Sequence, residues 1–168
     1  MSRQAVKEWA QVIIVAVLFG LFLRGFVVER LVVDGPSMEP TLYNHEELLI
    51  NKFVYRFSPP KRNDVIVFRY PLNPSLDYIK RIVAVGGQTV ELRFGKLYVD
   101  GVPVDEPMVR PSTGNFSKVT VPKGYVFVMG DNRPVSEDSR IFGPVPESNI
   151  KGKAMIVWWP ISRIRMIR

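Results

Sequence analysis

The most apolar stretch of the chain lies near its N-terminus, at residues 9–28, WAQVIIVAVLFGLFLRGFVV. Twenty residues of helix span about 30 Å, which matches the hydrocarbon core of a bilayer. Trp9 stands where an interfacial anchor would, and Arg24 is close enough to the other end to extend its charge to the headgroups. A signal peptide has a shorter apolar core and a small-x-small cleavage site, and a buried helix is rarely apolar on all sides. We therefore expect a transmembrane anchor at residues 9–28, after a short tail at residues 1–8.

The sequence changes character after residue 28, and no long segment with a 3.6-residue period follows. Short runs rich in β-branched and aromatic residues, such as DVIVFRY, YIKRIVAV and YVFVMGD, are separated by Gly, Pro, Asn and Asp. Asp100-Gly101, between extended residues, is a strong hairpin signal. The pattern predicts a mainly β protein with a compact, antiparallel, barrel-like domain over residues 29–168.

Composition excludes several kinds of chemistry. The chain has no cysteine and a single histidine, His45, so disulfides, thiol nucleophiles, zinc–thiolate sites and multi-histidine metal sites are ruled out. The formal net charge is +7, but the basic residues are spread along the chain in no long run, which argues against a nucleic-acid partner. We expect no metal and no cofactor. Any catalysis must come from Ser, Lys, Asp, Glu, Tyr or Arg.

The segment VVDGPSMEPTL contains a candidate nucleophile, Ser37. Gly35 can adopt backbone conformations closed to other residues, while Pro36 and Pro40 stiffen the turn on either side of the serine. A serine held in this way at the end of a strand is exposed and oriented. The alternative is a serine that only bends or caps the chain, as most serines in such turns do.

A base for that serine would have to be His45 or a lysine. His45 lies in the polar segment LYNHEEL, where nothing nearby would orient its ring, so a solvated loop histidine is the simpler interpretation. Lys80 lies in LDYIKRIVAV, on the strand face shared with Tyr78 and Ile82. Burial there would lower the pKa of its amine and make it a base. Alternatively, Lys80 pairs with a carboxylate, or only its stem is buried.

A third polar stretch, MGDNRPVSEDSR, follows the strand YVFV. In a functional interpretation Asp138 and Arg140 form a supporting ion pair, and the Ser136 hydroxyl orients the lysine amine. The alternative is a solvated turn with alternating charges, whose pairs usually contribute under about 1 kcal/mol.

The motifs GPSMEPTL, RNDVIVFRYP, DYIKRIV and GDNRPVSEDSR occur in this order behind the apolar segment. Together they resemble bacterial type I signal peptidase, in a short single-span form, over essentially the whole chain. The resemblance implies a membrane-bound Ser/Lys serine endopeptidase that removes signal peptides from exported preproteins after small residues, at Ala-x-Ala sites. It implies a cytoplasmic tail at residues 1–8 and a β catalytic domain outside the plasma membrane. The expected partners are signal peptides and lipid, with the enzyme monomeric.

The resemblance also assigns roles to particular side chains. Ser37 matches the family's nucleophile and Lys80 its general base. Ser136 matches a second serine whose hydroxyl contacts the lysine, and Asp138 and Arg140 match the ion pair that supports the site.

Two further features of the site follow from the motifs. The backbone N–H of Ser37 is the natural oxyanion donor. Some relatives carry a side-chain hydroxyl at the position of Gly35, so the second donor is left open between a backbone N–H and a water. Met38, Val67 and Ile79 are candidates for lining shallow substrate pockets, or are plain core residues.

Two alternative functions, and the placement of the C-terminal tail, stay open at this point. The chain could be a self-cleaving Ser/Lys regulator, although it lacks a DNA-binding segment. It could also be an anchored β domain that captures extended peptides without cutting them. Trp158, Trp159 and the tail ISRIRMIR either rest at the membrane interface or form a terminal strand with a basic end.

Overall fold

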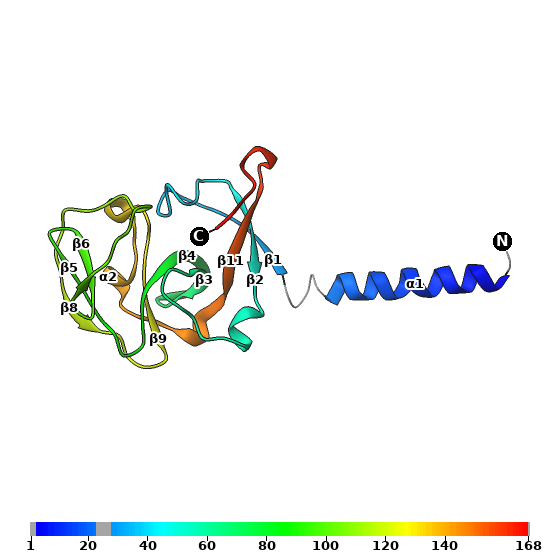
Figure 1. Ribbon diagram of the computed structural model, residues 1–168, viewed down its shortest axis with the longest axis horizontal. Helices are drawn as coiled ribbons and strands as arrows, with labels where there is room; N and C mark the ends of the chain where they lie inside the picture. Colours follow the sequence, from blue (N-terminus) through cyan, green and yellow to red (C-terminus); the bar gives the residue numbers. More distant parts are fainter. Residues whose placement is uncertain (1–2, 23–27, 168) are drawn as a thin grey trace.

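The computed structural model describes residues 3–22 and 28–167 (Figure 1). The two α-helices are α1 (Arg3–Phe22) and α2 (Ser139–Phe142). The strands are β1 (Val28–Val32), β2 (Glu47–Asn51), β3 (Val65–Tyr70), β4 (Asn73–Val85), β5 (Thr89–Arg93), β6 (Lys96–Val99), β7 (Val102–Pro103), β8 (Phe116–Thr120), β9 (Tyr125–Met129), β10 (Val145–Pro146), β11 (Ile150–Trp159) and β12 (Arg165–Met166). Short 3₁₀ turns are η2 (Val54–Arg56), η3 (Arg133–Val135), η4 (Glu147–Asn149) and η5 (Ile161–Arg163).

The N-terminal helix α1 extends away from the β structure (Figure 1). Among the described residues, no helix combines the length and the hydrophobicity needed to cross a membrane. The predicted anchor at residues 9–28 includes residues 23–27, Arg24 among them, which lie outside the described part. Its last residue, Val28, belongs to β1. The anchor therefore stays a prediction.

The prediction of a mainly β, antiparallel protein is confirmed. An eight-stranded sheet has the order β1-β2-β11-β3-β4-β9-β10, with β12 added to β11, and a four-stranded sheet has the order β7-β6-β5-β8. The predicted hairpin is present, because β6 and β7 pair across Asp100 and Gly101. Both turn residues have positive φ, 52° and 78°, as a two-residue hairpin turn requires.

The strand sequences explain which faces are buried. In β2 the alternating residues Leu48 and Ile50 face the core, whereas β9 is apolar at every position and is buried along nearly its whole length. One core cluster lies around Met38 and Leu42, just beyond β1, so the loop between β1 and β2 is anchored from beneath by its own apolar side chains.

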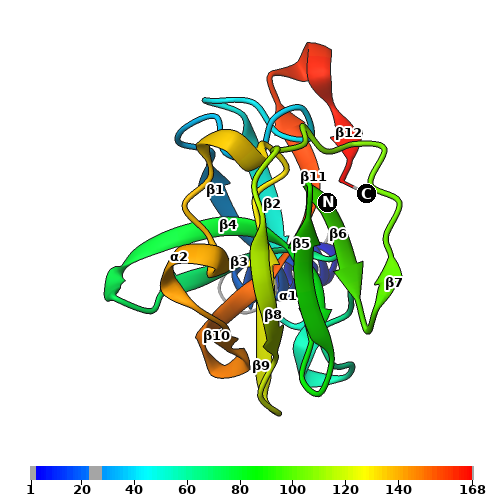
Figure 2. The same cartoon turned by 90° about the vertical axis from the view of Figure 1, so that its left-hand side faces the viewer.

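Among the described residues, β1 and the first part of β4 each have one edge with no strand beside it, and these two edges bear on the site. β1 pairs only with β2. β4 pairs with β3 from Asn73 to Arg81, but its pairing with β9 begins only at Arg81. Figure 2 shows β1 and β4 on the same side of the domain. The space between them is where the candidate site lies.

Candidate active site

The loop that carries Ser37 is fixed at both the side chain and the backbone. Met38 is fully buried, and the amide of Leu42 donates to the Met38 carbonyl at 2.9 Å. Asn132, which follows β9, donates from its backbone N–H to the Ser37 carbonyl at 3.0 Å. Gly35 has a φ of +87°, a conformation that residues with a Cβ rarely adopt. These contacts leave Ser37 at the surface of a rigid turn.

Lys80 reaches this serine from β4. Its Nζ donates to Ser37 Oγ at 2.8 Å and to the Ile79 carbonyl at 3.0 Å. The lysine is only 5% exposed, and burial lowers the pKa of its amine to about 8, although the negative charges of Asp138, Glu137 and Asp131 oppose that shift. Within the described residues no carboxylate lies within 4.0 Å of Nζ. The two alternatives, a lysine paired with a carboxylate and a wet amine, are therefore wrong.

The predicted ion pair between Asp138 and Arg140 is present. Arg140 Nε and Nη2 donate to Asp138 Oδ1 and Oδ2, each at 2.8 Å. Asp138 is fully buried and its Oδ2 also accepts from the Gly130 amide at 3.1 Å. Arg140 Nη2 donates to the Arg133 carbonyl at 2.8 Å. The pair thus holds residues 130–140 in a compact fold against the serine loop.

Ser136 lies close to Ser37, but its hydroxyl makes no hydrogen bond to Ser37 or Lys80. Its Oγ is buried and has no hydrogen-bond partner among the described residues. A Cβ added to Gly130 would clash with Ser136 Oγ and with the Ser37 carbonyl oxygen, so this close packing leaves room only for glycine at position 130. The role expected for Ser136, a hydrogen bond to the Lys80 amine, stays a prediction.

A buried ion pair that the sequence analysis missed joins three segments of the site. Arg81 Nε and Nη2 donate to Asp131 Oδ1 and Oδ2 at 2.8 and 2.7 Å, and Thr41 Oγ1 donates to Asp131 Oδ2 at 2.5 Å. Arg81 is 7% exposed and Asp131 is fully buried. The sequence contains a signal for this pair, because Lys80 and Arg81 are adjacent on one strand and so face opposite sides of the sheet, which makes a buried partner for Arg81 as necessary as one for Lys80.

A residue late in the chain also holds the serine loop. Arg165, in β12, donates to Glu46 Oε1 at 2.8 Å, to Glu46 Oε2 at 2.7 Å and to the Thr41 carbonyl at 2.7 Å. Burial alone would raise the pKa of Glu46, but its hydrogen bonds with Arg165 and with the Tyr43 amide lower that pKa on balance. The strand that carries Arg165 therefore braces the loop from the far side.

A groove of about 390 Å³ lies between the free edges of β1 and β4 and includes Ser37 and Lys80 in its lining. It is lined by Leu31, Val32, Asp34, Ser37, Leu76, Asp77, Tyr78, Ile79, Lys80, Val135 and Glu137. Of the three pocket candidates, Ile79 lines the groove. Met38 and Val67 do not; both are fully buried in one core cluster.

The remaining candidates lie outside the groove. His45 is exposed, with its Nε2 3.1 Å from Asn44 Nδ2, as expected of a solvated loop histidine. In the part of the chain that the structure describes, no three His, Cys, Asp or Glu side chains gather as metal ligands. The chemistry available to the site is that of a hydroxyl and an amine.

The site thus combines a serine hydroxyl, a buried lysine amine hydrogen-bonded to it and a groove between two free strand edges, all of which a serine protease can use. Comparison with known proteins agrees. A family model described as signal peptidase, peptidase S26, matches residues 6–159. The chain belongs to this family, the signal peptidases, and is a signal peptidase of the serine protease class.

Individual relatives show how far the similarity extends. A probable signal peptidase I-1 of Synechocystis is 40% identical over 168 residues, which cover 95% of this chain and 86% of the relative. Signal peptidase I T of Bacillus subtilis is 36% identical over 96% of this chain and 89% of its own length. The crystal structure of a signal peptidase I from Enterococcus faecalis matches with a TM-score of 0.51 at 34% identity, covering 57% of this chain and 97% of that one.

Proposed function

We propose that this signal peptidase cuts preproteins with a catalytic dyad in which Ser37 is the nucleophile and Lys80 is the general base. The observation that carries the proposal is the 2.8 Å contact between Lys80 Nζ and Ser37 Oγ, made by a lysine that is almost fully buried. A neutral amine at this distance can accept the serine proton directly. General-base catalysis of this kind contributes about 10²–10⁴-fold to a rate.

The reaction then follows in two halves. Ser37 Oγ attacks the scissile carbonyl while Lys80 takes its proton, and an acyl-enzyme forms. The protonated lysine gives that proton to the leaving amine, and the neutral lysine afterwards activates the water that releases the signal peptide. No other base is needed for either half.

The oxyanion that develops in each half requires hydrogen-bond donors already in place. The backbone N–H of Ser37 is the natural first donor. The N–H of Gly35 donates to Asn44 Oδ1 at 2.9 Å, so Gly35 offers neither a side chain nor a free amide as the second donor. We propose a bound water or another backbone amide for that role.

Asp138 and Arg140 are proposed to act through the segment they hold. Because their ion pair fixes residues 130–140, it sets where Ser136 stands relative to the dyad. The buried and unpartnered Ser136 Oγ is then available to accept a hydrogen bond from the lysine amine when that amine turns toward it.

The groove supports the binding of an extended substrate that the enzyme cuts after small residues. A peptide lying between β1 and β4 can add its backbone hydrogen bonds to both free edges. Ile79 at the groove floor, backed by the fully buried Met38 and Val67, leaves little depth for a large side chain. This fits an Ala-x-Ala preference, since a larger residue would clash.

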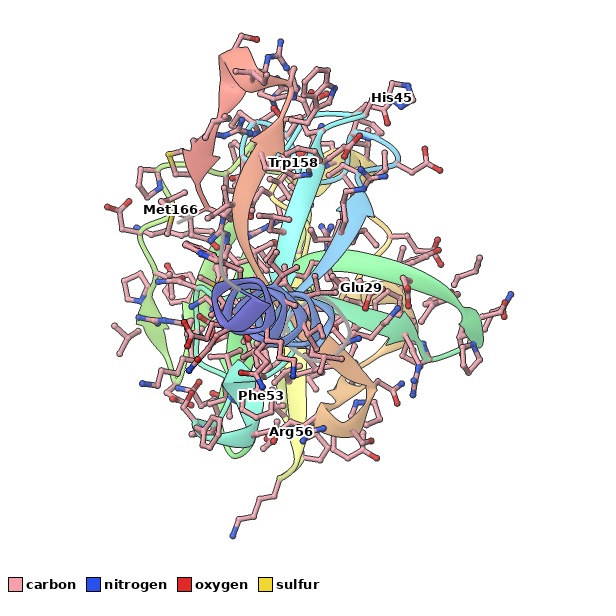
Figure 3. The ribbon with its side chains drawn as sticks, turned by 90° about the vertical axis from the view of Figure 1, so that its right-hand side faces the viewer. Glu29, His45, Phe53, Arg56, Trp158 and Met166 are labelled. Carbon is pink, nitrogen blue, oxygen red and sulfur yellow. The ribbon has the colours of Figure 1, made fainter. Side chains whose placement is uncertain are left out.

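We also propose that residues 9–28 anchor the enzyme in the plasma membrane, with the β domain on the extracytoplasmic side. On α1, large apolar side chains such as Trp9, Ile13 and Leu18 are about 60% exposed, and an apolar surface of this kind is unfavourable in water unless lipid or protein buries it. Figure 3 looks along α1 toward the β domain, with Trp158 and Met166 on the facing side. Trp159 and Met166 are exposed, which suits contact with the membrane interface.

The test is cleavage of a purified preprotein, in detergent or lipid, by wild type, Ser37→Ala and Lys80→Ala. Wild type should cut once after a small residue, and both variants should be folded and at least about 10²-fold slower. If Lys80→Ala cuts as fast as wild type, Lys80 is structural and the dyad is refuted. If wild type binds preproteins but cuts none, the chain is a capture module.

A further inference from the structure

The groove carries more negative than positive charge. Three carboxylates line it, those of Asp34, Asp77 and Glu137, and Lys80 is the one Lys or Arg among the described lining residues. Lys80 must be neutral to act as the base. A peptide in the groove of the active enzyme therefore faces carboxylates without an opposing cation from the lining.

Glu137 differs from Asp77 in how its charge is compensated. Asp77 accepts a hydrogen bond from Lys151 Nζ at 2.6 Å, which forms an ion pair. No Lys or Arg nitrogen lies within 4.0 Å of the Glu137 carboxylate in the described part of the chain. Its partners are two phenols, Tyr70 OH at 2.6 Å and Tyr78 OH at 3.2 Å. Glu137 thus lines the groove without an ion-pair partner among the described residues.

The two tyrosines also hold this carboxylate in place. Their rings stack with centroids 4.4 Å apart and planes inclined by 6°, and each hydroxyl binds a different oxygen of Glu137. The Tyr78 ring lies 5.3 Å from Lys80 Nζ, so one side chain contacts Glu137 through its hydroxyl and faces the lysine amine with its ring. The hydrogen bond from Tyr70 to Glu137 raises the pKa of that phenol to about 12, so it stays a donor at neutral pH.

We propose that Glu137 makes the groove select substrates by charge, favouring a basic side chain and disfavouring an acidic one where the peptide passes Tyr78. This inference rests on the proposed function, since it requires the cut peptide to lie in this groove. The physical basis is a Coulomb interaction over a few ångströms in a partly desolvated site, which amounts to about a tenfold difference in kcat/KM between a lysine and a glutamate.

The experiment uses the full chain in detergent and a neutral peptide with one Ala-x-Ala site. Lys, Gln or Glu replaces each position around the cut in turn, except the two alanines of the site, and kcat/KM is measured for wild type, Glu137→Gln and the control Asp105→Asn. Asp105 is an exposed carboxylate outside the groove. For wild type, at least one position should give the order Lys, Gln, Glu, with a Lys/Glu ratio of about ten that shrinks as salt is added.

The outcomes separate the inference from the function on which it rests. Glu137→Gln should bring the ratio close to one, whereas Asp105→Asn should leave it unchanged. A wild-type ratio of one at every position overturns charge selection, and a ratio that Glu137→Gln leaves intact overturns the role of Glu137. If Glu137→Gln does not fold, the salt dependence of the wild type decides. Failure of wild type to cut even the Gln peptides would instead refute the proposed function.

Discussion

Replacing Lys80 by methionine should abolish cleavage and yet stabilise the folded chain at neutral pH. The folded-state pKa of about 8 lies below the ordinary value of 10.5, so the unfolded chain binds the proton more tightly. The wild type therefore loses stability as pH falls from 10.5 to 8, and the loss stays constant below that range. The shift corresponds to about 3 kcal/mol at pH 7 and to about 1 kcal/mol at pH 10.

Methionine fills a similar volume without this cost, although it gives up two hydrogen bonds worth about 1 kcal/mol each. The quantity to measure is therefore the change with pH. Urea unfolding, followed by tryptophan fluorescence in detergent, gives the difference in unfolding free energy between Lys80→Met and wild type. The unfolding free energy of Lys80→Met, taken relative to wild type, should be about 2 kcal/mol higher at pH 7 than at pH 10.

The matched control is Lys118→Met, at an exposed lysine on β8. Its unfolding free energy relative to wild type should not change between the two pH values. If Lys80→Met shows the same flat behaviour as this control, Lys80 is charged in the folded protein. The argument that burial makes it a base would then be refuted.

Two other predictions follow from the same geometry. With a Lys80 pKa of about 8, the kcat/KM for a neutral peptide should rise about tenfold between pH 7 and pH 9 and then level off, because the amine loses its proton in this range. A flat profile, with chemistry shown to be rate-limiting, would contradict this prediction. Asp131→Asn should lower the unfolding free energy by about 3–5 kcal/mol, because it removes the carboxylate charge that pairs with the buried Arg81. The double variant Arg81→Met/Asp131→Leu should recover much of that loss in urea titrations.

The strand content was predictable from local sequence, because apolar runs bounded by Gly, Pro and Asp leave few alternatives. Ser37 and Lys80 stood out as candidates for a related reason: a lysine in an otherwise apolar strand is costly, and Ser37 stands in a rigid Gly–Pro turn. Their expected roles, however, came only from the resemblance of four motifs to a known family. The Asp138–Arg140 pair was predictable too, since its members are two residues apart and close at the start of α2.

What the sequence did not reveal depends on contacts between distant segments. Arg81 and Asp131 are 50 residues apart in sequence, and their pairing follows from the alignment of β4 with β9. The groove, likewise, exists because β4 extends past the start of its pairing with β9. The burial of Met38 and Val67 behind the groove also depends on how the sheet curves, which no local pattern records.

The bonds from Arg165 to Glu46 and to the Thr41 carbonyl have a consequence for biosynthesis. Ser37 leaves the ribosome early, but the strand that braces its loop is made after every other strand of the domain. The loop cannot reach its final contacts until that strand has emerged. A nascent chain therefore carries Ser37 long before the loop around this serine can be completed.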